Sequence, residues 1–138
     1  MLFRSAAIFR FYNLDWDDGN NVHPDERFVT MQATGLQWPD SIGEYFDSDA
    51  SPLNPFNGPN GGYIYGTFPL FLQKAMAAVV GRDSYDGFAV VGRFASGLFD
   101  LATVLLIILI GRRLFGEKTG ILAGLLLAAS VLPIQLAH

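Results

Sequence analysis

Four side chains that could take part in chemistry stand together in the segment NVHPDERFV, residues 21–29. They are His23, Asp25, Glu26 and Arg27. A positioned carboxylate can remove a proton from a hydroxyl group, so the adjacent acids Asp25 and Glu26 are candidates for general-base chemistry. His23 and the two acids would also suit a divalent cation, although three ligands make a small set and no second cluster accompanies them.

The same segment has a purely structural interpretation. Pro24 suits the first position of a helix, and acids in the first turn complement the positive end of the helix dipole. A helix that begins here would continue through ERFVTMQATGL and end near Gly35. The local pattern therefore predicts a helix over residues 24–35 and does not decide whether its acids also carry chemistry.

Two ionisable residues lie inside a long apolar run, where charged groups are costly and often functional. Arg93 stands near the start of the run, and a guanidinium can hold phosphate oxygens through two parallel hydrogen bonds. An arginine in this position can instead extend to the membrane surface. Asp100 lies seven residues further on, which is about 10 Å along a helix and too far for a direct pair with Arg93. We expect Asp100 to meet a polar group on another helix, in a structural role.

The elements that would position these residues are spanning helices. Residues 88–110 form an apolar run of 23 residues, long enough to cross a hydrocarbon core of about 30 Å. Residues 119–138 form a second run without acids, lysines or arginines. Gly120, Gly124 and Ala128 recur every four residues in it, which favours close helix packing. We expect the partners of this face and of Asp100 to lie in helices outside the chain.

The connection between the two runs carries three basic residues, and short basic loops usually stay on the cytoplasmic side. Residues 111–118 are therefore predicted to be a cytoplasmic loop. Residues 13–87 would then face the outside as a loop with helices near 24–35 and 68–80. The helix at 68–80 is too short to span and too apolar for a free surface, so we expect it to lie on the membrane, with Lys74 near the headgroups.

The first twelve residues are apolar and carry two arginines, but they have no cleavage site of the kind that ends a signal peptide. They are interpreted as the end of a truncated first spanning helix, and the run at 119–138 is also predicted to be truncated.

Composition narrows the classes of function. Hydrophobic residues make up 51% of the 138 residues and charged residues 16%, which is unusual for a soluble domain. The net charge is −4 and no basic cluster accompanies the aromatic residues, so nucleic acid is not an expected partner. The absence of cysteine excludes disulfides and thiolate chemistry.

The order of these features resembles the lipid-carrier-dependent glycosyltransferases of the GT-C fold, which include protein O-mannosyltransferases and aminoarabinose transferases. The resemblance rests on the acidic pair after the first spanning segment and on the run VGRFASGLFDLATVLLIILIGRRLFG. It covers nearly the whole chain, which would correspond to the amino-terminal part of such an enzyme. It implies an all-α membrane protein with an extracytoplasmic first loop.

The resemblance also implies a reaction. A sugar would move from a polyprenyl-phosphate carrier to a hydroxyl acceptor on a protein, lipid or glycan, with Asp25 as general base and inversion at the sugar carbon. Glu26 would assist Asp25, and Arg93 with His23 would bind substrate. No cofactor is implied beyond a divalent cation, and membrane lipids are the surrounding partners. The natural setting is a bacterial cytoplasmic membrane, and the fragment alone is expected to be inactive.

Two other hypotheses remain. The chain would be a non-catalytic membrane subunit or a piece of a transporter if its acidic loop were only a solvated outer segment. It would be a soluble helical domain if both apolar runs were core helices, although their length argues against that.

Overall fold

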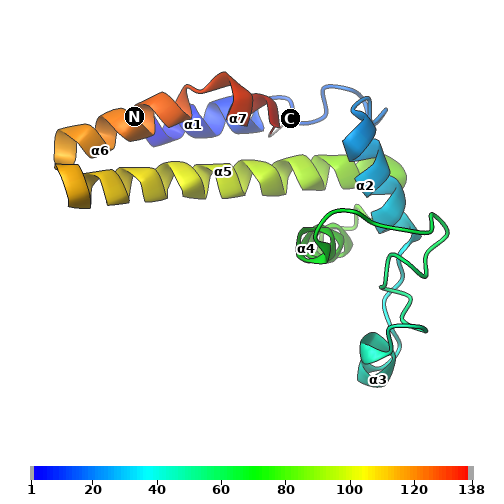
Figure 1. The fold of residues 1–138 in the computed structure, drawn as a ribbon. Helices are drawn as coiled ribbons and strands as arrows, with labels where there is room; N and C mark the ends of the chain where they lie inside the picture. Colours follow the sequence, from blue (N-terminus) through cyan, green and yellow to red (C-terminus); the bar gives the residue numbers. More distant parts are fainter. Residues whose placement is uncertain (1, 137–138) are drawn as a thin grey trace. The chain divides into compact units, whose positions relative to one another are not determined.

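The computed structural model describes residues 2–136, and these residues form helices and loops without any strand (Figure 1). The all-helical class expected from the sequence is confirmed. In chain order the helices are α1 Leu2–Phe11, α2 Pro24–Gly35, α3 Ile42–Phe46, α4 Thr67–Val79, α5 Tyr85–Phe115, α6 Glu117–Ala128 and α7 Val131–Leu136. The resemblance predicts a larger set of spanning helices, and that part of the fold stays a prediction.

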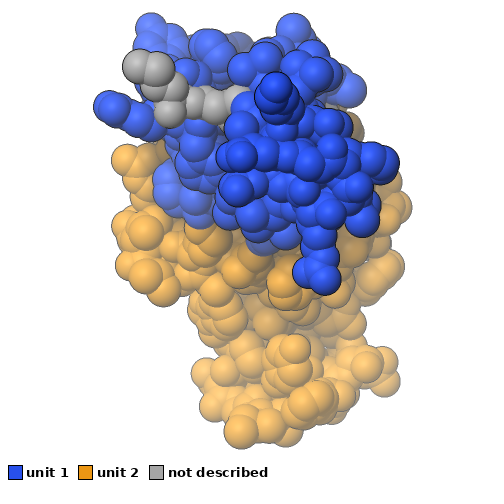
Figure 2. Space-filling model, turned by 90° about the vertical axis from the view of Figure 1, so that its left-hand side faces the viewer, with its two compact units in different colours: residues 1–16, 92–138 blue, residues 17–91 orange. Residues whose placement is uncertain are grey.

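The chain divides into two compact units, coloured separately in Figure 2. Unit 1 combines residues 1–16 with residues 92–138, and unit 2 is the segment 17–91 between them. Each unit has its own apolar core. The boundary falls inside α5, so this helix contributes its first turns to unit 2 and the remainder to unit 1.

Helix α5 is the one helix among residues 2–136 that is long and apolar enough to cross a membrane, judged by length and composition. It spans 31 residues, so it extends beyond the predicted run 88–110 at both ends. Only about a fifth of its most apolar stretch, 22%, is buried inside the protein. Most of the apolar side chains in this stretch are therefore exposed on the surface of the protein.

The prediction of a second continuous helix over 119–138 is wrong. Helix α6 ends at Ala128, and α7 begins at Val131. Pro133 explains the interruption, because in a continuous helix its ring would clash with the carbonyl of Ala129. In α7 the proline occupies the first turn, where its missing N–H has no intrahelical partner to lose. His138 lies outside the described residues.

The predicted loop at 111–118 is also wrong. Helix α5 continues through Arg112 and Arg113 to Phe115, and only Gly116 separates it from α6. Gly116 has φ 93°, a left-handed conformation that glycine adopts without steric cost. The two arginines lie in the last turn of α5, where they complement the negative end of the helix dipole.

The small residues of α6 pack where the sequence pattern indicates, since Gly120, Gly124 and Ala128 are all buried. A Cβ atom added at Gly120 would lie 2.6 Å from the carbonyl oxygen of Ile108 on α5. A Cβ at Gly124 would overlap the Ile108 side chain. The close approach is therefore confirmed, and the expectation that its partner lies outside the chain is wrong.

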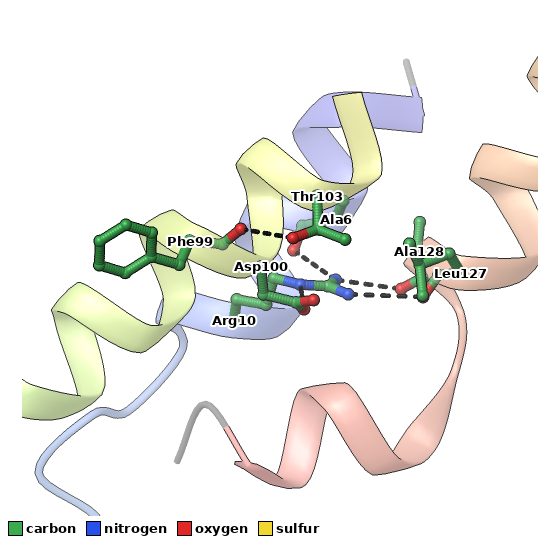
Figure 3. Close-up of polar contacts among 7 residues, drawn as sticks. All are labelled: Ala6, Arg10, Phe99, Asp100, Thr103, Leu127 and Ala128. Atoms are coloured by element: carbon green, nitrogen blue, oxygen red, sulfur yellow. Dashed lines mark hydrogen bonds and ion pairs between the residues drawn. The ribbon is translucent and has the colours of Figure 1, made fainter. Parts of the chain in front are cut away.

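Asp100 finds its polar partner on α1 (Figure 3). Its carboxylate forms an ion pair with Arg10, whose side chain is 0% exposed. The same guanidinium donates to the carbonyls of Ala6, Leu127 and Ala128. The expectation that Asp100 meets a polar group on another helix is confirmed, and that helix belongs to this chain.

Unit 2 is organised by the contact of α2 with α4. Its core contains Ala33 from α2 and Leu36 directly after that helix, together with Leu70 and Ala77 from α4. Lys74 lies on the same buried face of α4, 3% exposed, and its ammonium contacts Asp83 at 2.8 Å. The expectation that Lys74 reaches towards lipid headgroups is therefore wrong, because its charge is paired inside the unit.

Candidate active site

The acidic pair lies in the first turn of α2, as the proline and acid pattern predicts. His23 is the capping residue, has an extended backbone and makes no side-chain capping bond. The Asp25 side chain is exposed to solvent and Glu26 is half-buried. The acids therefore do serve the helix start, and the exposure of Asp25 also leaves its carboxylate open to a substrate.

The loop before α2 is held by Asn21, which is 0% exposed. Its side-chain amide donates to the carbonyl oxygens of Gly19 and Tyr85 at 3.2 and 3.4 Å, and its Oδ1 accepts from the Thr30 hydroxyl at 3.3 Å. Its carbonyl accepts from Arg27 Nε at 3.2 Å. These bonds tie the loop to the body of α2 and to the start of α5, so they orient the turn that carries Asp25.

Asp17 and Gly19 complete this loop. The Asp17 carboxylate accepts from the backbone N–H of Val22 at 3.2 Å. Gly19 has φ 74°, and a Cβ atom added there would lie 3.3 Å from the backbone oxygen of Asp86. A side chain at this position would therefore be strained by conformation and crowded by the neighbouring backbone. The acids and asparagines of DDGNN build a rigid support and are more than solvated loop residues.

Tyr65 lies near enough to Asp25 for the charge of that carboxylate to contribute to its raised pKa. Its ring lies edge-on to Phe28 and Tyr63, with centroid distances of 6.2 and 5.7 Å. Phe28 in turn stacks on Tyr63 at 6.1 Å. We call Phe28, Tyr63 and Tyr65 the aromatic cluster. It forms one wall beside the carboxylate.

The segment that carries the two tyrosines is fastened to the second half of α2. The buried side chain of Gln32 donates to the carbonyl oxygen of Gly62 at 2.7 Å. Asn60 donates to the carbonyl oxygen of Met31 at 3.1 Å. Gly61 and Gly62 have φ 64° and 159°, so the turn depends on glycine. Two bonds and the turn thus bring Tyr65 back along α2, where its ring meets Phe28.

The electrostatics of the cluster follow from this arrangement. The pKa of Tyr65 is raised above its ordinary value by desolvation, then by the charge of Asp25 and its hydrogen bond to that carboxylate. Burial raises the pKa of Tyr63, and the neighbouring Tyr65 adds to the increase. Both phenols therefore hold their protons more firmly than a free tyrosine.

Arg93 belongs to unit 1 and has a different environment. It is 3% exposed, and its Nη1 donates to the carbonyl oxygen of Leu14 at 2.7 Å. Its guanidinium carbon lies 5.3 Å from the centre of the Trp16 ring, a cation–π contact. These contacts anchor the segment after α1 to α5. The role of Arg93 in binding phosphate stays a prediction.

The divalent cation considered for His23, Asp25 and Glu26 has no preformed cage in the described part of the chain. Among residues 2–136, no group of three histidine or acidic side chains lies close enough to hold a metal ion. A cation bound at Asp25 and Glu26 would have to complete its ligands with water or substrate oxygens. Whether the reaction uses a metal stays a prediction.

Comparison with known proteins does not change this description. Neither protein-family models, nor curated protein sequences, nor solved structures gave a match. The assignment of function therefore rests on the residues and their geometry.

Sequence reasoning missed Tyr65 and Asn21 as parts of the site. Tyr65 is 40 positions from Asp25 in the chain, so no local pattern relates the two. Its neighbour Tyr63 is buried, 7% exposed. The turn former NGG just before the tyrosines was the available signal, since it predicts a reversal of the chain at that point.

Proposed function

We propose that the chain is part of a membrane glycosyltransferase that moves a sugar from a polyprenyl-phosphate carrier to a hydroxyl acceptor. Asp25 is the general base, and α5 is the helix that anchors the site in the membrane. The observation that carries the proposal is the exposed Asp25 carboxylate in the first turn of α2, beside the loop that Asn21 holds. The resemblance to the GT-C enzymes supplies the class of reaction.

The reaction removes the proton of the acceptor hydroxyl and replaces the bond between the sugar and the carrier phosphate with a bond to the acceptor oxygen. The acceptor oxygen would bond to the anomeric carbon while its proton passes to a carboxylate oxygen of Asp25. The bond from that carbon to the carrier phosphate breaks, and its electron pair leaves with the phosphate. The phosphate is a stable anion, so a single base suffices and no general acid is required. Attack opposite the leaving group inverts the sugar carbon.

The proposed placement follows the charge pattern of the chain. Unit 2 carries the acidic residues of the segment after α1 and would face the outside of a bacterial cytoplasmic membrane. The end of α5, with Arg112 and Arg113, would lie on the cytoplasmic side. Half-buried Glu26 stands beside the base in the same helical turn and would bind the acceptor or a cation with it.

The test is sugar transfer from a polyprenyl-phosphate-sugar pool in membranes that carry the full-length reading frame. Asp25→Asn keeps the size of the side chain and removes the base, and we expect transfer to fall by at least about 100-fold. Asp49→Asn is the matched control, because Asp49 is an exposed acid of the same unit. Transfer equal to that of the wild type in Asp25→Asn would reject the proposal and favour a non-catalytic membrane subunit.

Arg93 is tested by Arg93→Lys in the same membranes. If Arg93 binds the phosphate through two hydrogen bonds, loss of this bidentate contact would raise the KM for the lipid-linked donor while protein levels stay normal. A role limited to the contacts with Leu14 and Trp16 would instead lower the protein level or melting temperature without a change in KM. The two outcomes separate a phosphate ligand from an anchor.

A further inference from the structure

The end of α5 and the start of α6 bring three positive charges together within unit 1. Arg112 and Arg113 lie in the last turn of α5, and Lys118 lies in the first turn of α6. Gly116 alone separates the two helices. We call residues 112–118 the α5–α6 corner, which lies at the left end of both helices in Figure 1. We infer that this corner binds the headgroup of an anionic phospholipid through its phosphate.

The basic side chains of the corner are exposed and have little use inside the protein. Arg112 is 51% exposed, and its Nη2 lies 3.9 Å from a carboxylate oxygen of Glu117. An exposed pair at that distance contributes little to stability. The side chains of Arg113 and Lys118 are exposed and make no hydrogen bond or ion pair within the described part of the chain. Three bases against one acid leave the corner with a net positive charge.

The corner also holds most of the exposed positive charge of unit 1. Unit 1 contains six lysines and arginines, and three of them lie in the corner. Two of the others, Arg10 and Arg93, are buried. A guanidinium can bind two phosphate oxygens at once, and an ammonium adds a point charge. The corner therefore offers the groups that bind phosphate.

Apolar side chains beside these charges indicate that the phosphate belongs to a lipid. Leu114 and Phe115 lie in the same turn as the two arginines and are 65% and 73% exposed. The preceding turns of α5 expose further apolar side chains, those of Leu105, Leu106, Ile107, Leu109 and Ile110. Acyl chains would cover this apolar surface, and basic side chains at its end would reach the headgroups. A soluble phosphate would meet the charges and leave the apolar side chains in water.

The net charge of the corner selects the class of lipid. A zwitterionic headgroup presents a cation together with its phosphate, so a positive site gains little net attraction from it. An anionic headgroup has no such cation, and basic residues at the end of a spanning helix favour it. Charge complementarity therefore assigns an anionic phospholipid to the corner.

The experiment titrates the purified full-length protein in detergent, at low salt, with phosphatidylglycerol or with phosphatidylcholine that has the same acyl chains. Native mass spectrometry measures the dissociation constant of each lipid. We expect the wild type to bind phosphatidylglycerol about 20-fold more tightly than phosphatidylcholine. The combined change of Arg112, Arg113 and Lys118 to glutamine should reduce this preference to within about twofold.

Single variants test the charge without a large change at the corner. Arg113→Gln should lower the preference about fivefold, and Glu117→Gln, which removes the acid, should raise it by a similar factor. Arg82→Gln is the matched control for Arg113→Gln. Arg82 is also an exposed arginine, but it belongs to unit 2. Its replacement should leave the preference within about twofold of the wild type.

Three results would overturn the inference: equal binding of the two lipids by the wild type, a preference that survives in the triple variant, or equal losses in Arg82→Gln and Arg113→Gln. Displacement of phosphatidylglycerol by inorganic phosphate at equal concentration would also overturn it, because the site would then recognise the anion alone. Equal melting temperatures of the single variants exclude misfolding as the cause.

This inference shares with the proposed function only the membrane placement of α5. Lipid binding is measured without sugar transfer, and Asp25→Asn leaves the corner unchanged. Loss of transfer in Asp25→Asn with no lipid preference in the wild type would support the proposed function and reject the lipid site. The opposite pair of results would reject the proposed function and support the lipid site.

Discussion

Arg10, which is fully buried, and the half-buried Asp100 form an ion pair between α1 and α5, across 90 positions of the chain. The pair also explains why α6 ends where it does. Where α6 and α7 separate, the Ala128 carbonyl loses the N–H partner that a continuous helix would supply, and the Leu127 carbonyl accepts from the N–H of Ser130 at 3.1 Å. Arg10 donates to both of them, at 3.4 and 3.1 Å. One side chain thus joins three helices at the point where the third one breaks.

Removal of either partner should destabilise unit 1. Arg10→Met leaves the Asp100 carboxylate without its partner and takes the guanidinium donor from the Ala128 carbonyl, and we expect a loss of about 3 kcal/mol in unfolding free energy. Asp100→Leu should cost a similar amount, because the Arg10 charge is left buried. The double variant should cost clearly less than the sum of the two. Unfolding in detergent measures all three, and additive losses would show that the pair is not coupled.

A methyl group at Gly120 should separate α6 from α5. The added Cβ would lie 2.5 Å from the Arg112 backbone nitrogen and 2.6 Å from the Ile108 carbonyl oxygen. Neither backbone atom can move without the helix, so Gly120→Ala should cost about 1–3 kcal/mol. Leu126→Ala lies on the exposed side of the same helix and serves as the control. A melting temperature of Gly120→Ala equal to that of the wild type would contradict the packing described for this helix pair.

Loss of the Asn21 side chain should disturb the site without touching its acids. Asn21→Ala leaves the buried hydroxyl of Thr30 without its acceptor and removes one of the donors to the Tyr85 carbonyl, and we expect a stability loss of about 1–3 kcal/mol. Sugar transfer should fall as well, because the turn that carries Asp25 is less well held. Asn20→Ala is the control, since Asn20 is exposed and its side chain bonds only within the loop, to the Asp17 carbonyl at 2.6 Å. Equal effects of the two changes would argue against the special role of Asn21.

Tyr63 and Tyr65, the two tyrosines of the aromatic cluster, should lose their phenolic protons at a higher pH than a free tyrosine. Their pKa values are raised, that of Tyr65 by desolvation and then by Asp25, and that of Tyr63 by burial. The folded chain therefore keeps these protons where the unfolded chain loses them. Stability should fall as the pH rises from about 10, the ordinary tyrosine value, through the folded pKa values. Ultraviolet titration of phenolate in detergent measures the shift by comparison with Tyr65→Phe and Tyr63→Phe.

Asp25→Asn adds a direct check of the contact. The substitution removes the charge beside Tyr65, so the pKa of Tyr65 should move back towards the ordinary tyrosine value, and the part due to desolvation should remain. A Tyr65 titration that is the same in both proteins would show that its hydroxyl does not meet the Asp25 carboxylate in solution.

The sequence by itself determined the local elements. Pro24 followed by two acids predicts the start of α2, and Gly35 predicts its end, because capping and dipole effects act within one turn. The apolar run around Arg93 and Asp100 predicts a long helix. The four-residue spacing of Gly120, Gly124 and Ala128 predicts a close helix contact. Each of these signals depends on neighbours at most a few positions away.

Tertiary structure alone decided which distant groups meet. Asp100 was expected to need a polar partner, but nothing in the spacing names Arg10, and nothing local places Tyr65 against Asp25. The break in α6 depends partly on Pro133, which is visible in the sequence. It also depends on Arg10, which donates hydrogen bonds to the carbonyls at the end of α6 only after the helices pack. Such pairings are selected by the burial of charge and by the cost of unsatisfied carbonyls. Those energies exist only once separate segments have come together.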